Sequence, residues 1–233
     1  MPRTRIKICG ITSLELAKCA VEHGADAIGL VFADGSLRRI SIDVAAEIVH
    51  WLPPFVTAVG VFQLQEVSKA SRHQGIEAAR QRISDQRSAA SGQWQALEQW
   101  KQMAHWVQLH GDETEQVVKQ VARGSGIIRG FRFYEGQVRK WDQSPHVRML
   151  LIDGHAPGKG RGFRHGDLAA LMPRISKPVM LAGGLSVENV AAAIRAVRPY
   201  AVDVSSGVET EPGKKSPDLI AAFCTAVREA DED

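Results

Sequence analysis

The sequence predicts a single (β/α)8 barrel, a TIM barrel, over residues 1–233. Short apolar runs rich in valine and isoleucine recur eight times, and each is nearly continuous, as in strands of a parallel sheet that is covered on both faces. A helix pattern follows each run, which is the alternation of a closed barrel. An open doubly wound sheet is less favoured because no Gly-x-Gly-x-x-Gly fingerprint follows an early strand.

The eight strands are expected at residues 5–11, 27–32, 55–62, 106–111, 126–133, 147–153, 178–184 and 201–207. Two capping-box spacings, Thr12 with Glu15 and Asp112 with Glu115, predict where helices begin. The last two helices are predicted from apolar stripes at helical spacing, formed by Val187, Val190, Ala191, Ile194 and Val197 and by Leu219, Ile220, Phe223 and Val227. The connection after Phe133 has the weakest helix pattern.

The connection between strands three and four, residues 63–105, is about twice as long as one helix and its turns require. Its later part, residues 93–104, has an apolar side made of Trp94, Leu97, Trp100 and Ala104 and predicts the outer helix. Residues 63–92 are therefore predicted to be an insertion or arm within the domain. A partly helical lid near the active site and an inert surface elaboration are equally compatible with the sequence.

Composition excludes several classes of protein. The net charge is +3, and residues 69–87 alone carry five basic and two acidic side chains, without interleaved aromatic residues. This pattern is typical of a solvated helix face and not of a nucleic-acid site. No apolar run is long enough for a membrane helix, and the first residues do not read as a secretory signal. Three widely spaced cysteines argue against disulfides or structural zinc and favour the cytoplasm. The oligomeric state, monomer or homodimer, is left open.

In such a barrel the chemistry belongs at the carboxyl ends of the strands. Four features fall at these ends: Cys9, Asp153, the pair Gly183–Gly184, and Ser205–Ser206–Gly207. Glycine-rich loops after strands seven and eight let backbone N–H groups approach a phosphate, although glycines also serve tight turns.

Asp153 and Cys9 each have a chemical and a structural interpretation. A carboxyl group at the rim of an apolar barrel is partly desolvated, which raises its pKa and suits a general acid; a lone aspartate can equally cap a helix. Cys9 can serve as a base if the turn and helix start near Thr12 favour its thiolate, or it can be a small buried hydrophobe, as expected for Cys19 and Cys224.

Other polar residues fall at the same predicted rim. Arg38 and Arg39 follow strand two, where an arginine can hold a carboxylate or phosphate through two parallel hydrogen bonds. Gln108 and His110 end strand four, and His110 either lines a pocket or satisfies a backbone group.

Six segments, KICGI, VQLHGDE, LLIDG, GKGRGF, LAGGLSVENV and AVDVSSGVETEPGKK, resemble in order the phosphoribosylanthranilate isomerase family. The resemblance implies a cofactor-free and metal-free Amadori rearrangement of N-(5-phosphoribosyl)anthranilate in tryptophan biosynthesis. It implies Asp153 as general acid, Cys9 as general base, Arg38 against the anthranilate carboxylate, and Asp203 as a polar pocket residue. Gln108 and His110, from their place at the end of strand four, are expected to bind the substrate with them. It also implies that Gly183, Gly184, Ser206 and Gly207 bind the phosphate.

Two departures from the family pattern bear on this expectation. The loop after Asp153 reads GKGRGFRHG and lacks the family's Phe-Asp-Trp, with Arg161 in place of a lysine. Gln-Leu-Gln follows Phe62, where the family usually has an asparagine-containing segment, and forms the start of the 63–92 insertion. The alternatives are a related histidine-pathway isomerase, which Cys9 in place of an aspartate disfavours, and a catalytically impaired phosphate-binding barrel that acts through partner binding by the insertion.

Overall fold

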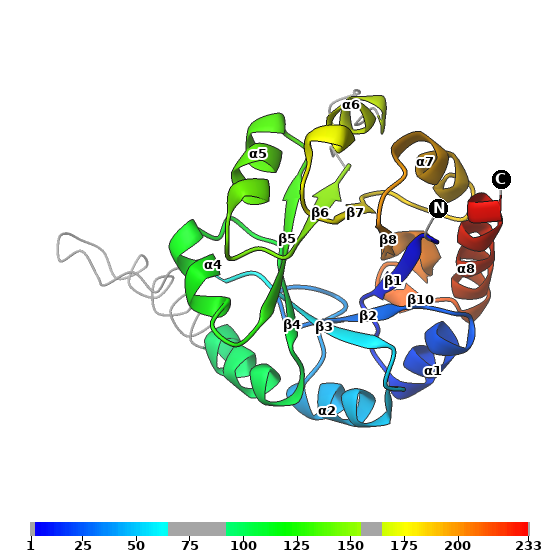
Figure 1. The fold of residues 1–233 in the computed structure, drawn as a ribbon. Coiled ribbons are helices and arrows are strands. Elements are labelled where there is room, and N and C mark those ends of the chain that lie inside the picture. Colours follow the sequence, from blue (N-terminus) through cyan, green and yellow to red (C-terminus); the bar gives the residue numbers. More distant parts are fainter. Residues whose placement is uncertain (1–2, 65–91, 155–164, 233) are drawn as a thin grey trace, which may run out of the picture.

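The computed structural model describes residues 3–64, 92–154 and 165–232, and they form a closed parallel barrel (Figure 1). Neighbouring strands pair in sequence order, and β8 closes the barrel against β1. The strands are β1 Arg5–Cys9, β2 Ala27–Val31, β3 Thr57–Phe62, β4 Trp106–Leu109, β5 Gly126–Arg132, β6 Met149–Asp153, β7 Val179–Ala182 and β8 Ala201–Val204. The predicted barrel is therefore confirmed, with strand ends shifted by a few residues.

Helices surround the barrel and follow the strands, as predicted. They are α1 Leu14–Glu22, α2 Ile42–Trp51, the helical residues 92–103, α4 Glu115–Val121, α5 Glu135–Gln143, α6 His165–Leu171, α7 Val190–Val197 and α8 Pro217–Glu232. The weakly predicted helix after Phe133 is present as α5. Two short 3-10 turns, η1 Met172–Arg174 and η2 Ser206–Val208, and a hairpin of β9 Glu209–Glu211 and β10 Lys214–Lys215 complete the described chain.

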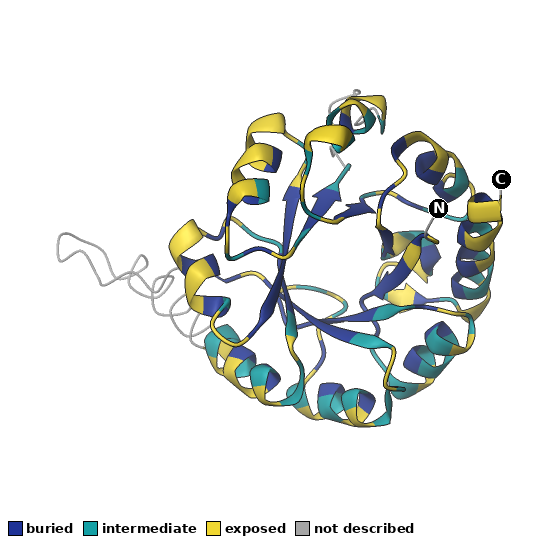
Figure 2. Cartoon of the chain, in the orientation of Figure 1, coloured by how far each residue is buried: buried dark blue, intermediate teal, exposed yellow. Residues whose placement is uncertain are grey.

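Side-chain alternation along each strand decides what faces the barrel interior. In β1, Ile6 and Ile8 join the large cluster that packs between sheet and helices, so Lys7 and Cys9 must point inward. The inner apolar side chains are fewer and include Val59, Leu151 and Met180. Figure 2 shows the result, with buried strands and helices that are buried only on their inner sides. Polar residues on an inward register therefore reach the interior or the rim.

The helix at residues 92–103 confirms the expected packing. Leu97 and Trp100 are completely buried, and Trp94 and Ala104 pack partly against the same core. Trp100 lies against Gly60 of β3, where any Cβ would approach the indole to 2.6 Å. Its Nε1 donates to the carbonyl oxygen of Trp106 at 3.0 Å, which ties the helix to the start of β4.

Both capping-box predictions are wrong in detail. The N-cap of α1 is Ser13, whose hydroxyl accepts from the Leu16 N–H, and that of α4 is Thr114, which accepts from the Val117 N–H. Serine and threonine are both favoured N-caps, and each helix begins one to two residues later than predicted.

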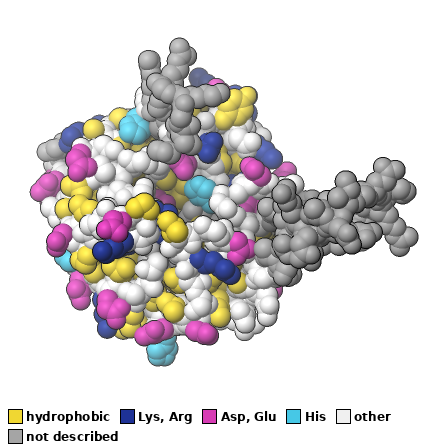
Figure 3. Space-filling model, turned by 180° about the vertical axis from the view of Figure 1, so that it is seen from behind, with side chains coloured by type: hydrophobic (Ala, Val, Ile, Leu, Met, Phe, Trp, Pro, Cys, Tyr) yellow, Lys and Arg dark blue, Asp and Glu magenta, His cyan; other side chains and the backbone are white. Residues whose placement is uncertain are grey.

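The predicted arm at residues 63–92 and the basic stretch within it lie almost wholly outside the described residues, so both stay predictions. The face in Figure 3 shows acidic and basic side chains interspersed over the described part of the chain. No helix of the described residues is long and apolar enough to cross a membrane.

Candidate active site

The barrel places five of the predicted site residues on inward registers. Cys9 and Asp153 close β1 and β6, Gln108 lies in β4, and Asp203 lies in β8. His110 follows β4 and continues its inward register. Because parallel strands end at the same edge, Cys9, His110 and Asp153 lie at the carboxyl end of the barrel.

Cys9 is buried beside an ion pair. Its neighbour on the inward register, Lys7, places Nζ 2.7 Å from Oδ1 of Asp203, and both charged residues are buried. Burial raises the pKa of the Cys9 thiol, and the positive charges of Lys7 and Lys215 oppose that rise. The nearest described positive charge on the same strand is thus Lys7, whereas α1 begins only at Leu14.

His110 connects Gln108 with Asp153. The Gln108 Nε2 lies 3.0 Å from His110 Nδ1, and His110 Nε2 lies 3.6 Å from Asp153 Oδ2. The imidazole lies across Gly130 of β5, where a Cβ would approach Nδ1 to 2.6 Å, so the missing side chain gives the ring its position. With the amide as donor, the ring proton is on Nε2, directed at Asp153.

Arg38 is held by an acidic partner that was not predicted. Its Nε and Nη2 donate to the two carboxylate oxygens of Glu209 at 2.7 and 2.6 Å, and Lys215 pairs with the same carboxylate. Burial would raise the pKa of Glu209, but hydrogen bonds from Arg38, Lys215 and the Gly213 N–H lower it to about 2. Arg39, considered with it, is exposed and pairs with Asp34 at 3.4 Å.

The two predicted phosphate loops lie against each other. Gly183 and Gly184 have φ of +90° and +68°, in the left-handed region that glycine adopts without strain. A Cβ on Gly207 would lie 1.9 Å from the carbonyl oxygen of Leu185, so the loop after β8 packs on the loop after β7 through this glycine. Ser206 beside it is exposed.

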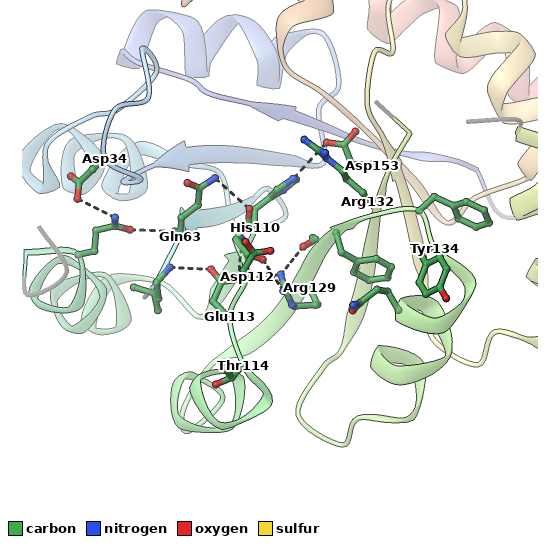
Figure 4. A pocket seen from close by; sticks show the side chains of 17 residues that line it. Asp34, Gln63, His110, Asp112, Glu113, Thr114, Arg129, Arg132, Tyr134 and Asp153 are labelled. Atoms are coloured by element: carbon green, nitrogen blue, oxygen red, sulfur yellow. Dashed lines mark hydrogen bonds and ion pairs between the residues drawn. The ribbon is translucent and has the colours of Figure 1, made fainter. Parts of the chain in front are cut away.

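A cavity of about 1180 Å³ opens between β3 and β6 at this end of the barrel (Figure 4). Of the predicted site residues, His110 and Asp153 line it, and Figure 4 shows the two side chains directed toward each other. Arg132 and Tyr134 line the side of the cavity nearest β5.

A buried ion pair supports the wall of this cavity. Glu113 lies in the loop after β4 that also carries His110. It accepts from the N–H groups of Leu64 and Gly111 and lies 3.1 Å from Arg129 Nη1. Arg129 also donates to the carbonyl oxygens of Leu109, Gly111 and Gly130. This network joins the loops after β3 and β4 to β5.

The sequence pattern does not single out Lys7, Glu209, Lys215, Glu113 or Arg129. For Lys7 the signal was available, since a charged residue on the inward register of an apolar strand, two positions from Cys9, is expected inside the barrel. The pairing of Arg38 with Glu209 joins residues 171 positions apart and leaves no short-range pattern. Within the described residues, no cluster of histidine, cysteine and carboxylate side chains could hold a metal ion.

A closed eight-stranded parallel barrel with ionisable side chains gathered at its carboxyl end defines the class: this is a (β/α)8-barrel enzyme. The family model described as N-(5′-phosphoribosyl)anthranilate (PRA) isomerase matches residues 95–226. An N-(5′-phosphoribosyl)anthranilate isomerase from Acidithiobacillus ferrooxidans is 40% identical, over 98% of this chain and 99% of its own.

Comparison with solved structures indicates the same family. Phosphoribosylanthranilate isomerase from Thermotoga maritima is 36% identical, with a TM-score of 0.74 and coverage of 97% of this chain and 99% of its own. A phosphoribosylanthranilate isomerase in complex with reduced 1-(o-carboxyphenylamino)-1-deoxyribulose 5-phosphate is 34% identical, with a TM-score of 0.70 and coverage of 97% and 99%. The chain belongs to the N-(5′-phosphoribosyl)anthranilate isomerase family, as the sequence motifs predicted.

Proposed function

We propose that Asp153 and Cys9 divide the proton transfers of the isomerase reaction between them. The observation that carries this proposal is their placement, since both close strands on inward registers at the carboxyl end of one barrel. They belong to strands on different parts of the rim, β1 and β6, so a substrate between them would meet the two groups from different sides.

Asp153 donates a proton to the furanose ring oxygen of N-(5′-phosphoribosyl)anthranilate. The bond from C1′ to that oxygen breaks, its electron pair remains on the oxygen as a hydroxyl, and the lone pair of the anthranilate nitrogen forms the C1′=N bond of a protonated Schiff base. The position of Asp153 supports this role, because the residue ends β6 at the carboxyl end of the barrel and lines the cavity there, 3.6 Å from His110 Nε2.

Cys9, as the thiolate, then takes the proton from C2′. The C–H electron pair becomes the C1′=C2′ bond, and the C=N electron pair returns to nitrogen to give a neutral enolamine. Loss of the C2′ hydroxyl proton and protonation of C1′ convert it to the ketone, 1-(2-carboxyphenylamino)-1-deoxyribulose 5-phosphate. The inward side chain of Cys9 at the carboxyl end of β1 supports this assignment.

Binding is assigned to the remaining predicted residues. The backbone N–H groups of Gly183, Gly184, Ser206 and Gly207 would bind the phosphate, which the contact between their two loops supports. Arg38 would bind the anthranilate carboxylate through Nη1, because Glu209 takes Nε and Nη2.

Gln108, His110 and Asp203 would contact the sugar. Gln108 lies on the inward register of β4, and its Nε2 is 3.0 Å from Nδ1 of His110, which lines the cavity.

The test is loss of substrate fluorescence with purified protein and no added metal. Cys9→Ala and Asp153→Asn are each expected to lower kcat by about 10²-fold or more, since a positioned acid or base contributes about 10²–10⁴-fold. Cys19→Ala, which alters a half-buried thiol of α1, is the matched control and should keep full activity. Full activity in Cys9→Ala or Asp153→Asn would refute the role given to that residue.

The oligomeric state is proposed to be monomer or homodimer, and a relative from Thermotoga maritima is described as dimeric. Light scattering would distinguish a 25.4 kDa monomer from a dimer. The three cysteines are free, which supports the predicted cytoplasmic location.

A further inference from the structure

We infer that Lys7 is the positioning residue that stabilises Cys9 as a thiolate, its ammonium group fixed inside the barrel by Asp203 and directed at the sulfur. The inference rests on the proposed role of Cys9 as general base. It assigns a function to a residue of β1 to which the proposed chemistry gives no part.

The backbone register brings the three groups together. Lys7 and Cys9 are two residues apart on β1 and share the inward face. Lys7 pairs in register with Asp203 of β8, and Cys9 pairs with Gly29 of β2. The 2.7 Å ion pair therefore fixes the Lys7 ammonium from one neighbouring strand, while the other strand leaves space in front of it.

Gly29 provides the space in which sulfur and ammonium meet. A Cβ at this position would lie 2.7 Å from the Cys9 Sγ and 3.0 Å from the Lys7 Nζ. The missing side chain thus leaves a small volume that both polar groups border. Any larger residue at position 29 would separate the cation from the thiol.

The charges around Cys9 leave one positive charge without a carboxylate. Among the described residues, the cations that interact with Cys9 are Lys7, Lys215 and Arg38. The carboxylates are Asp203, paired with Lys7, and Glu209, paired with both Arg38 and Lys215. In the enzyme without substrate, a thiolate at Cys9 would balance the charge of this cluster, in which the side chains of Lys7, Asp203, Glu209 and Lys215 are buried and that of Arg38 is partly exposed.

The pKa of Cys9 is raised on balance, and the contribution of Lys7 limits that rise. Burial raises the pKa of Cys9, and Lys7 is the first of the groups that oppose the rise. Burial lowers the pKa of Lys7, but Asp203 and Cys9 outweigh it and raise that pKa above its ordinary value, so Lys7 stays charged. Once Cys9 takes a proton, the cluster regains its positive charge, which favours release of that proton in the later steps.

The test is a titration of the Cys9 thiol that does not depend on catalysis. Thiolate ultraviolet absorbance is followed against pH in a protein carrying Cys19→Ser and Cys224→Ala, with the additional Cys9→Ala variant as blank. Lys7→Met should move the thiolate midpoint to higher pH by about 1–3 units, the usual effect of one opposite charge at close range.

Asp203→Asn should move the thiolate midpoint to lower pH. The substitution removes an anion near the sulfur, so the charge of Lys7 is no longer offset by a carboxylate and stabilises the thiolate more strongly. General disruption of the site would not produce shifts of opposite sign. Lys7→Met alone leaves Asp203 buried without its cation. The double variant Lys7→Met with Asp203→Leu removes both charges and so tests the loss of the Lys7 charge without an unpaired carboxylate. Circular dichroism confirms that each variant is folded. An unchanged midpoint in a folded variant that lacks the Lys7 charge would overturn the inference.

Activity separates this inference from the proposed function. If Cys9 is the base, the acidic limb of kcat/KM in Lys7→Met should move with the thiol midpoint. A shifted midpoint with an unshifted activity profile would support the role of Lys7 and refute that of Cys9.

Discussion

Replacing Glu113 by alanine is expected to destabilise the protein by about 3–5 kcal/mol, the usual cost of removing one partner of a buried ion pair. The Glu113 carboxylate is inaccessible to solvent and accepts from two N–H groups, of Leu64 at 3.0 Å and Gly111 at 2.9 Å, in addition to its contact with Arg129. The variant would leave the Arg129 guanidinium, only 4% exposed, without its anion.

For a chain of this length, 1 kcal/mol corresponds to about 2–4 °C in Tm, so the midpoint should fall by about 6–20 °C. The assay is urea unfolding and thermal unfolding followed by circular dichroism. The control is Glu135→Ala, which removes an exposed i,i+4 pair with Arg139 and should cost about 0.5 kcal/mol or less. Equal stability of the Glu113 and Glu135 variants would refute the argument that burial makes the first pair important.

Two further predictions concern the rim. Glu209, with a pKa lowered to about 2 from its ordinary 4.5, contributes stability that is complete above about pH 4.5 and is lost as the pH falls toward 2. In a plot of unfolding free energy against pH, Glu209→Gln should therefore reduce the loss of stability at acid pH. The control Glu211→Gln, at an exposed position of β9, should leave that loss unchanged. An unchanged acid loss in Glu209→Gln would contradict the lowered pKa of Glu209. Gly207→Ala must separate the loops after β7 and β8 and should raise KM for the phosphorylated substrate by about tenfold or more, about 1.4 kcal/mol of binding. Gly166→Ala, where a Cβ meets nothing within 4 Å, is the control, and equal KM values in the two variants would speak against the phosphate site.

Strand positions and inward registers were predictable because they depend on local patterns. The apolar runs predict eight strands, and alternation then places Cys9 and Asp153 inward at one end. Helix starts were less predictable, since Ser13 competes with Thr12 and Thr114 with Asp112 as N-caps.

Contacts between residues far apart in the sequence could not be predicted from the spacing of motifs. Arg38 and Glu209 meet only after the barrel closes, and the charge of Lys7 has a defined partner only once β1 lies beside β8. A closed eight-stranded barrel predicts that β1 and β8 are neighbours. The register that places Lys7 opposite Asp203 depends on how the strands are staggered, which the sequence pattern does not give.

The central claim is that Asp153 opens the ring and that Cys9 acts only afterwards, at C2′. Reductive trapping tests this order directly: each variant is incubated with substrate and cyanoborohydride, and mass spectrometry measures the reduced open-chain anthranilate adduct. Cys9→Ala should accumulate the Schiff base and give more adduct than substrate without enzyme, whereas Asp153→Asn should give no more than that blank. As much adduct from Asp153→Asn as from Cys9→Ala would contradict the account.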